Sequence, residues 1–362
     1  MSRLQYIDST QNLSTACAAI AACQQLGVDT EFVRERTFFA RLCLIQIATH
    51  DEIFLIDPLA FDDLELLWQA LDQNTLILHA ARQDLEIIGQ TAKRLPTTVR
   101  DTQIMAALAG FAPQIGYAAL VRELIGVKLD KSKTRTDWSR RPLDASERAY
   151  AGADVAHLDA LHGQLAEKLS AMGRLEWAQD DSQALLAPAL YDNPAELAWQ
   201  RVKGLSRLPP AQRSTAMALA AWRESVAVDR NLPRQWVLRD SELLAIAAQY
   251  RFNGEPPRGF EDRNTERRHA GAIQRYLDAQ RDRLPEAVAG RGRPDPAERE
   301  RTDRTAALVA AVAADLGVEA EVIASMREIR AVSAGKRDAR LFQGWRRSLV
   351  GESVLAELDR SS

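Results

Sequence analysis

The chain has 362 residues, of which 46% are hydrophobic and 27% are charged, and its formal net charge is -3. This length predicts two or three domains, and the composition is that of a globular protein rather than a fibrous or membrane one. No stretch approaches the roughly 20 apolar residues of a membrane helix, and the start "MSRLQYIDSTQNLS" lacks a secretory pattern, so we expect a cytoplasmic protein. The net charge offers no overall attraction to nucleic acid, so such contacts require local patches.

The composition and the hydrophobic pattern of the sequence change along the chain. Up to about residue 110, helical segments alternate with the β-rich runs "LCLIQIA", "EIFLID", "NTLILHA" and "TTVRDTQIM". Beyond about residue 145 nearly everything has Ala, Leu, Arg and Glu at helical spacing, which predicts an α/β front and an all-α rear. Stretches rich in Pro, Gly or mixed charge predict breaks at 187–196, 252–264 and 284–304. The two rear segments share a long Ala-rich helix followed by "SELLAIAAQ" or "AEVIASMRE", which suggests a duplicated helical module.

Two acids interrupt the strand-forming segment "GVDTEFVRERTFFARLCLIQIATHDEIFLID", residues 27–57. Because side chains alternate faces along a strand, Asp29 and Glu31 project to the same side, whereas a helix would separate them by about 200°. Carboxylates about 4 Å apart repel by roughly 4 kcal/mol at a surface-like dielectric, unless a cation or a shared proton intervenes. Hard divalent metals meet that requirement. For an isolated D-x-E pair, the alternative is an edge strand whose acids are solvated.

A third acid follows the apolar run "TLILHA". In "ARQDLEII", Asp84 falls in the first turn of a predicted helix, close to a strand end of the kind at which open α/β sheets bind ligands. The alternative is that the helix dipole alone explains this acid, since it stabilises a carboxylate there by a few tenths to about 1 kcal/mol.

A tyrosine and a fourth acid lie on a later predicted helix. In "PLDASERAYAGADVAHLDALHGQLAEKL", Asp144 and Glu147 have capping-box spacing and predict the start of one long helix. Tyr150 and Asp154 share a face of it at i and i+4, and the small residues between them allow another backbone or a substrate to approach closely. Singly, they would be a core aromatic residue and a surface acid. Together with the earlier acids they predict a functional site.

These motifs resemble those of the DEDD 3′-to-5′ exonucleases, and within them the ribonuclease D family. The resemblance rests on "VDTEF", "HAARQDLEII" and "YAGAD", with Tyr150 marking the DEDDy branch, and it covers residues 1–190. It implies a ribonuclease H-like α/β exonuclease domain with a mixed sheet flanked by helices. The rear segments resemble HRDC domains, through "NLPRQWVLRDSELLAIA" in the first and more weakly in the second. Two small all-α domains are therefore expected, at 205–284 and 297–362.

The resemblance also implies the cofactor and the roles of the site residues. Two divalent cations, Mg²⁺ or Mn²⁺, would be held by Asp29, Glu31, Asp84 and Asp154. Asp29 would bridge both ions, Glu31 and Asp154 would complete one site, and Asp84 would hold the other through waters. Tyr150 would orient the attacking water, since a phenol with a pKa near 10 is a poor base at neutral pH. An all-oxygen donor set suits these metals, whereas zinc usually recruits His or Cys.

A basic loop, residues 127–141, precedes the helix that bears Tyr150. It contains six cations against two acids, a composition suited to backbone phosphates, although a solvated charge run is the alternative. The cations are Lys128, Lys131, Lys133, Arg135, Arg140 and Arg141. We single out Lys131, Lys133 and Arg135 as candidate substrate-binding residues.

Aromatic residues flank the first motif. Phe32 is a candidate to stack an unpaired 3′ base, because single-stranded RNA is held by stacking and phosphate pairing. For Phe38 and Phe39, core packing is the expected role. In the rear, a group of arginines around Trp236 suggests either nucleic-acid contact or surface salt bridges: Arg230, Arg234 and Arg239.

The predicted function is metal-dependent 3′-to-5′ exoribonuclease activity that trims single-stranded 3′ ends and releases 5′-mononucleotides. The resemblance alone suggests tRNA precursors and small structured RNAs as substrates. A DNA exonuclease on the same scaffold is one alternative, because the metal site does not discriminate sugars. An inactive nucleic-acid-binding tether is another, although the presence of all four acids and Tyr150 argues against it. The sequence does not determine the oligomeric state, and a monomer is our expectation.

Overall fold

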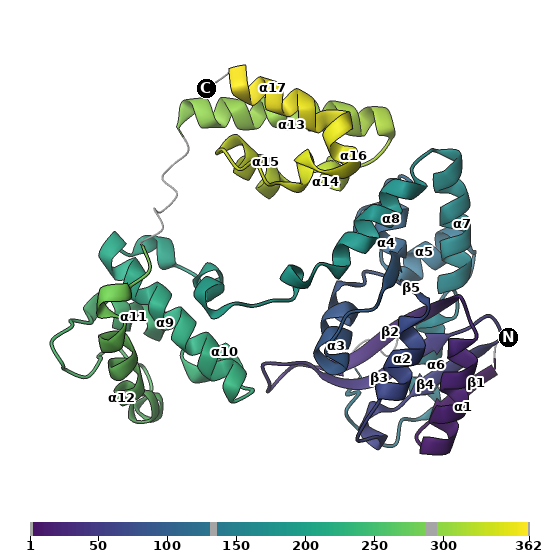
Figure 1. The fold of residues 1–362 in the computed structure, drawn as a ribbon, viewed down its shortest axis with the longest axis horizontal. Coiled ribbons are helices and arrows are strands. Elements are labelled where there is room, and N and C mark those ends of the chain that lie inside the picture. Colours follow the sequence, from purple (N-terminus) through teal and green to yellow (C-terminus); the bar gives the residue numbers. More distant parts are fainter. Residues whose placement is uncertain (1–2, 131–135, 287–294, 361–362) are drawn as a thin grey trace. The chain divides into compact units, whose positions relative to one another are not determined.

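The computed structural model describes residues 3–130, 136–286 and 295–360, and the chain divides into two compact units (Figure 1). The first unit comprises the described residues of 1–33, 42–190 and 295–362. The second comprises 34–41 and the described residues of 191–294. Within these described ranges no helix is both long enough and apolar enough to cross a membrane.

The first unit contains a mixed sheet of six described strands in the order β1-β4-β3-β2-β5-β6. β1 runs parallel to β4, β3 antiparallel to β4, and β2, β5 and β6 are parallel to one another. The central strands are apolar and buried on both faces, since the side chains of Leu44, Ile45 and Leu55 have no exposed area. The strands are β1 Arg3–Ile7, β2 Gln25–Val33, β3 Arg41–Ala48, β4 Glu52–Ile56, β5 Thr75–Leu78 and β6 Thr98–Asp101.

Helices flank this sheet, and α6 and α7 both contact β2. The helices are α1 Thr10–Ala21, α2 Glu65–Asp72, α3 Arg82–Ala92, α4 Thr102–Leu108, α5 Tyr117–Leu124, α6 Ala145–Val155, α7 Leu158–Ala171 and α8 Leu175–Gln183. The mixed sheet with flanking helices confirms the predicted α/β front.

Two local predictions for this unit were wrong. The run "TTVRDTQIM" is not all strand, because β6 ends at Asp101 and the Asp101 carboxylate caps α4 by accepting the backbone N–H of Gln103 at 2.8 Å. The long helix expected after Asp144 is two helices, since α6 ends at Val155 and α7 begins at Leu158.

The rear of the chain is helical, as predicted, and its two segments repeat one order of elements. Each has a long helix, a four-residue helix and then a further helix, which supports a duplicated module. The segment "SELLAIAAQ" belongs to the third element of its module, whereas "AEVI" forms the four-residue element of the other. The two segments are therefore not equivalent in the repeat, and matching "SELLAIAAQ" with "AEVIASMRE" was wrong. The helices are α9 Pro210–Asp229, α10 Arg234–Val237, α11 Asp240–Gln249, α12 Arg263–Ala279, α13 Pro296–Leu316, α14 Ala320–Ile323, α15 Met326–Ser333, α16 Gly344–Arg346 and α17 Glu352–Arg360.

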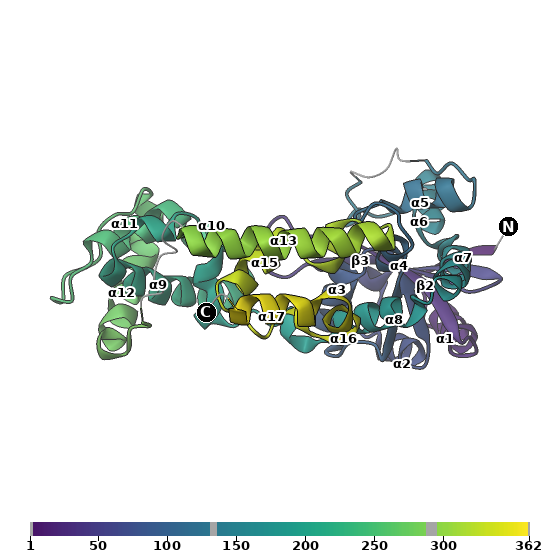
Figure 2. The ribbon, with the colours of Figure 1, turned by 90° about the horizontal axis from the view of Figure 1, so that it is seen from above.

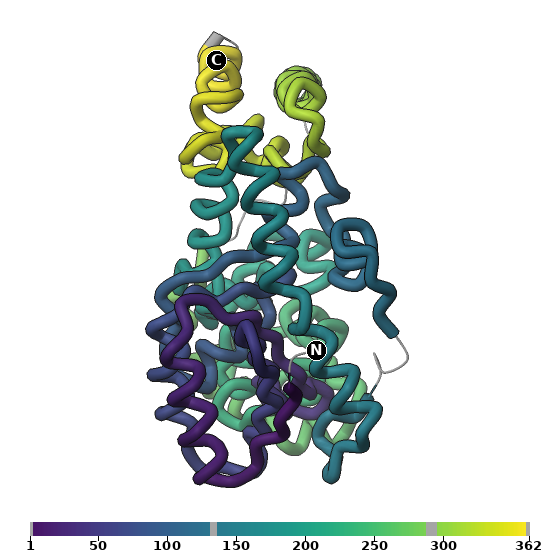
Figure 3. Tube along the Cα trace, turned by 90° about the vertical axis from the view of Figure 1, so that its right-hand side faces the viewer, coloured from purple at the N-terminus to yellow at the C-terminus, as the bar shows by residue number. Residues whose placement is uncertain are grey.

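The last helical segment packs within the first unit. In it, α13 and α17 lie side by side (Figures 2 and 3). The buried Arg346 guanidinium donates two hydrogen bonds of 2.6 Å to the Asp181 carboxylate of α8. Next to this ion pair, Trp345 stacks on Trp177 with ring centroids 4.8 Å apart. The paired geometry and the stacking fix this segment against the helices beside the sheet.

Candidate active site

The first two acids lie near the carboxyl end of β2. Gly27 pairs with Ile77 of β5, and β5 ends one residue later at Leu78, so β2 runs on beyond its neighbour. Asp29 and Glu31 are two apart on this projecting part and share the strand face toward α6, which contacts β2. Both side chains are partly buried. The sequence prediction that they are neighbours on a strand therefore agrees with the structure.

Helix α6 brings the tyrosine and the fourth acid to the same face. Its capping box is present, with the Asp144 carboxylate accepting the Glu147 backbone N–H at 2.8 Å. Tyr150 and Asp154 follow one turn apart and share a hydrogen bond. A Cβ at Gly152 would lie 2.5 Å from the Leu4 Cδ1 atom, so glycine there lets α6 pack closely on the sheet. The small residues therefore allow close helix packing, one of the two roles that the sequence suggested.

The remaining acid, Asp84, lies in the first turn of α3 and is 7% exposed. The Thr30 hydroxyl donates a 2.5 Å hydrogen bond to its Oδ1 atom. Thr30 points to the opposite face of β2 from Asp29, and it reaches Asp84 where β5 has already ended. Sequence reasoning missed Thr30, and the only available signal was a hydroxyl at a buried position of an otherwise apolar strand face.

The four carboxylates affect one another electrostatically. Burial raises the pKa of Asp29 well above its usual value, and the charges of Asp84, Asp154 and Glu31 raise it further. Burial, followed by the charges of Asp154 and Asp84, raises the pKa of Glu31 to about 8. Burial likewise raises the pKa of Asp84 to about 6 and that of Asp154 to about 7. Three separate elements therefore bring four acids close together at a cost in charge repulsion.

This donor set fits divalent cations. The charged groups that shift these pKa values are themselves carboxylates, so the repulsion calls for an external positive charge. Carboxylate oxygens are the ligands that Mg²⁺ and Mn²⁺ prefer. Across the described residues, no three His, Cys, Asp or Glu side chains already form a coordinating group. The acids are thus gathered without being arranged as a finished ligand shell.

Two tyrosines lie next to the acids. Burial raises the pKa of Tyr150, and the nearby charges of Asp154, Glu31 and Asp29 raise it further, so its hydroxyl keeps its proton. The Tyr117 hydroxyl donates to the Ala153 carbonyl at 3.2 Å and accepts the His157 backbone N–H at 3.1 Å. It thereby joins the end of α6 to the start of α7, immediately around Asp154. Sequence reasoning did not single out Tyr117.

The predicted substrate contacts are only partly described. Phe32 is half-buried on β2 next to Glu31. Lys131, Lys133 and Arg135 lie outside the described residues.

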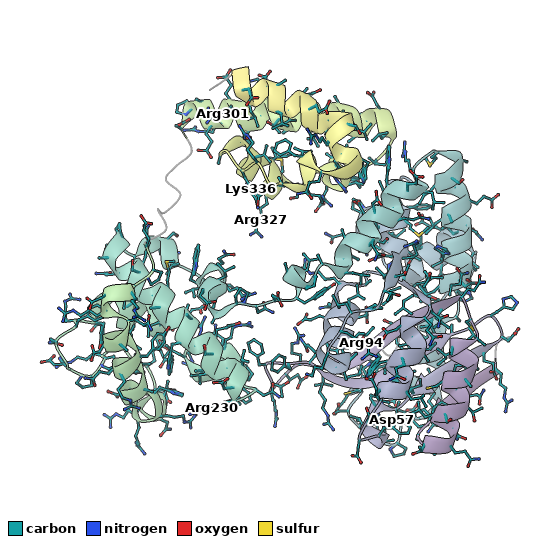
Figure 4. All side chains as sticks on the ribbon, in the orientation of Figure 1. Asp57, Arg94, Arg230, Arg301, Arg327 and Lys336 are labelled. Carbon is teal, nitrogen blue, oxygen red and sulfur yellow. The ribbon has the colours of Figure 1, made fainter. Side chains whose placement is uncertain are left out.

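Two other cations of the basic loop have structural partners. Arg141 donates hydrogen bonds of 2.5 and 2.6 Å to the buried Asp57, labelled in Figure 4, while Arg140 pairs with Glu147 at 2.7 Å. For Arg141 the expectation of a phosphate contact was therefore wrong, whereas for Arg140, whose side chain is 58% exposed, it stays a prediction. Arg141 also donates to the Trp138 carbonyl at 2.8 Å, and it holds this tryptophan beside the Tyr150 ring.

In the second unit, Phe38 is engaged in packing, and two of the arginines around Trp236 are engaged in ion pairs. Phe38 packs against the helical core with the Arg234 guanidinium 4.4 Å above its ring, which confirms the core role expected for Phe38. Phe39 is 37% exposed, so the same expectation was wrong for Phe39. Arg234 also pairs with the buried Glu224 at 2.6 Å, and Arg239 pairs with Glu261 at 3.2 Å. The salt-bridge alternative therefore accounts for both arginines.

Comparisons with known proteins agree with this geometry. Residues 4–170 match the model of a family described as 3′-5′ exonuclease. A ribonuclease D from Nitrobacter hamburgensis is 34% identical over 98% of this chain and 94% of its own. One from Jannaschia sp. is 36% identical over 98% and 95%. The crystal structure of Escherichia coli RNase D, described as an exoribonuclease involved in structured RNA processing, superposes with a TM-score of 0.88, 29% identity and 99% coverage of both chains.

Proposed function

Because the chain belongs to the ribonuclease D family and is a 3′-5′ exoribonuclease, we propose that it trims single-stranded 3′ ends and releases 5′-mononucleotides. The proposed substrates are tRNA precursors and other small structured RNAs in the cytoplasm. The observation that carries the proposal is the gathering of four carboxylates from β2, α3 and α6 beside a protonated tyrosine. We also propose the domain limits expected from the sequence, with the exonuclease domain at 1–190 and the two helical domains at 205–284 and 297–362.

The proposed cofactor is a pair of divalent cations, Mg²⁺ or Mn²⁺. Asp29, Glu31 and Asp154 would hold one ion, and Asp29 with Asp84 the other. When bound, such ions activate a water and neutralise the charge that develops on the phosphate and on the leaving 3′ oxygen. The protein supplies the acids, and it keeps them in place through contacts outside the ligand set.

The neighbouring side chains have distinct roles in this proposal. Tyr150 retains the proton on its hydroxyl and orients the attacking water by a hydrogen bond, rather than abstracting a proton. Thr30 fixes the direction of the Asp84 carboxylate through its hydroxyl. Phe32, next to Glu31, would stack the terminal base, and Lys131, Lys133 and Arg135 would pair with phosphates. These four substrate contacts are proposed from the sequence alone.

The proposal is tested by incubating a 5′-labelled single-stranded RNA with the full chain, with and without Mg²⁺ or Mn²⁺. We expect a ladder that shortens from the 3′ end only with metal, and its loss in Asp29→Asn and Asp154→Asn variants that keep the parent circular dichroism spectrum. Glu167→Gln, on the exposed face of α7, is the control. Metal-independent cleavage, or full activity in both Asp variants, would refute the proposed site.

A second arm of the experiment addresses the DNA alternative. The same oligomer is made with a 3′-terminal deoxyribose or entirely of DNA. Faster digestion of the RNA form supports the proposed substrate class. Equal or faster digestion of DNA would assign the site to a DNA exonuclease instead, without affecting the proposed role of the acids.

A further inference from the structure

A cavity of about 600 Å³ opens beside α5, outside the set of acids. Its volume falls in the range of small-ligand sites, about 300–1,000 Å³, which is sufficient for a nucleotide. One wall is the face of α5, and the other is the chain that follows this helix. The lining residues are Ala118, Ala119, Arg122, Lys128, Leu129 and Asp130.

The cavity is connected to the candidate active site through α5. Tyr117, the first residue of this helix, donates its hydrogen bond to the carbonyl of Ala153, the neighbour of Asp154. The charges of Asp154 and Asp29 also raise the Tyr117 pKa, after burial, so these groups lie close together. Arg122 follows Tyr117 by five residues, so it lies about 8 Å along the helix axis and about 140° around it, on the exposed face of α5. An RNA strand that reaches both the acids and Arg122 therefore passes along the helix and around it.

The lining combines positive charge with apolar surface. Arg122 and Lys128 are exposed, and within the part of the chain that the structure describes neither has an ion-pair partner. The lining also contains one acid, Asp130, so two cations against one acid leave a formal charge of +1. Arginine and lysine pair with phosphates, and the small apolar residues Ala118 and Ala119 leave room for a sugar or a base.

We propose that this cavity binds the RNA backbone upstream of the 3′ end, with Arg122 and Lys128 paired to phosphates. The inference rests on the proposed function, because it takes single-stranded RNA as the molecule that reaches the acids. It adds a specific prediction to that function. RNA long enough to reach the cavity is bound more tightly than a dinucleotide, and the extra affinity depends on salt.

The test compares Arg122→Gln/Lys128→Gln with a matched pair, Arg3→Gln/Lys93→Gln. The control residues are exposed and lie at the start of β1 and the end of α3, at the opposite end of the sheet from the acids. Binding of a 5′-fluorescent 12-nucleotide RNA is measured by anisotropy in EDTA, so that the result does not depend on hydrolysis. Unchanged melting temperatures establish that each variant is folded.

For the cavity variant we expect about tenfold weaker binding, and a slope of log Kd against log salt that is shallower by about 1.4, since each single-strand phosphate contact contributes about 0.7. The control variant should bind like the parent. In Mg²⁺, dinucleotide hydrolysis by the cavity variant should stay within about twofold of the parent, because a dinucleotide does not reach Arg122. Equal binding by both double variants, or an unchanged salt slope, would overturn the cavity assignment. Absence of hydrolysis in the parent would instead overturn the proposed function.

Discussion

Replacing one acid of the cluster should stabilise the protein when no metal is present. Asp154→Asn is the sharpest choice, because asparagine keeps the shape and can still accept the hydrogen bond that Tyr150 shares with Asp154. The substitution removes one negative charge from a site where burial and neighbouring carboxylates raise the pKa of several acids. We therefore expect higher stability together with loss of hydrolysis.

The size of the effect follows from the Asp154 pKa, which is about 7 in the folded protein against 3.8 for an ordinary aspartate. A raised carboxyl pKa favours the folded state at low pH, and this contribution is lost as pH rises through about 7. The raised pKa of Asp154 thus costs up to about 4 kcal/mol at pH 8, where the carboxyl is ionised, and about 2 kcal/mol at pH 5, where the folded protein keeps it protonated while the unfolded chain ionises it. Burying an amide costs about 1–3 kcal/mol at either pH. The stability difference between variant and parent should therefore grow by up to about 3 kcal/mol from pH 5 to pH 8.

The assay is urea denaturation in EDTA, followed by tryptophan fluorescence at pH 5 and pH 8. Glu167→Gln, an exposed acid on α7, is the control and should change stability by less than about 0.5 kcal/mol at both pH values. Added Mg²⁺ should stabilise the parent more than Asp154→Asn. A ligand stabilises the folded protein in proportion to how tightly the folded state binds it, and the variant lacks one of the carboxylates proposed to hold the metal. The stability difference between Asp154→Asn and the parent should grow from pH 5 to pH 8. A difference that stays the same at both pH values would refute the buried repulsive cluster.

Three other substitutions give separate outcomes. Tyr150→Phe should lower turnover about 10- to 100-fold while RNA affinity, measured by anisotropy, stays within about twofold, and equal losses in both would contradict a water-orienting role. Thr30→Val should raise the Mg²⁺ concentration for half-maximal activity about tenfold, because Asp84 loses its hydroxyl donor, whereas Thr30→Ser should behave like the parent. Asp57→Ala leaves Arg141 without its buried partner and should lower the free energy of unfolding by about 3 kcal/mol in urea titrations. A loss below about 1 kcal/mol would show that this ion pair does not anchor the basic loop.

Local spacing in the sequence was sufficient to predict the elements that carry the acids. Alternation along a strand places Asp29 and Glu31 on one face, and a capping box predicts where the helix of Tyr150 and Asp154 begins. Both predictions depend only on residues a few positions apart, because backbone geometry alone determines these directions. The motifs and their order in the sequence also indicate the family, which the comparisons confirm.

Only the tertiary structure decided which distant side chains meet. Thr30 reaches Asp84, 54 residues away, because β5 ends before β2 does. Arg141 pairs with Asp57 across 84 residues and is therefore a structural residue rather than a phosphate ligand. Such partners depend on strand length, register and the packing of helices on the sheet, and no short-range pattern encodes these. Residue spacing sets the direction of a side chain, whereas the packed fold sets what it touches.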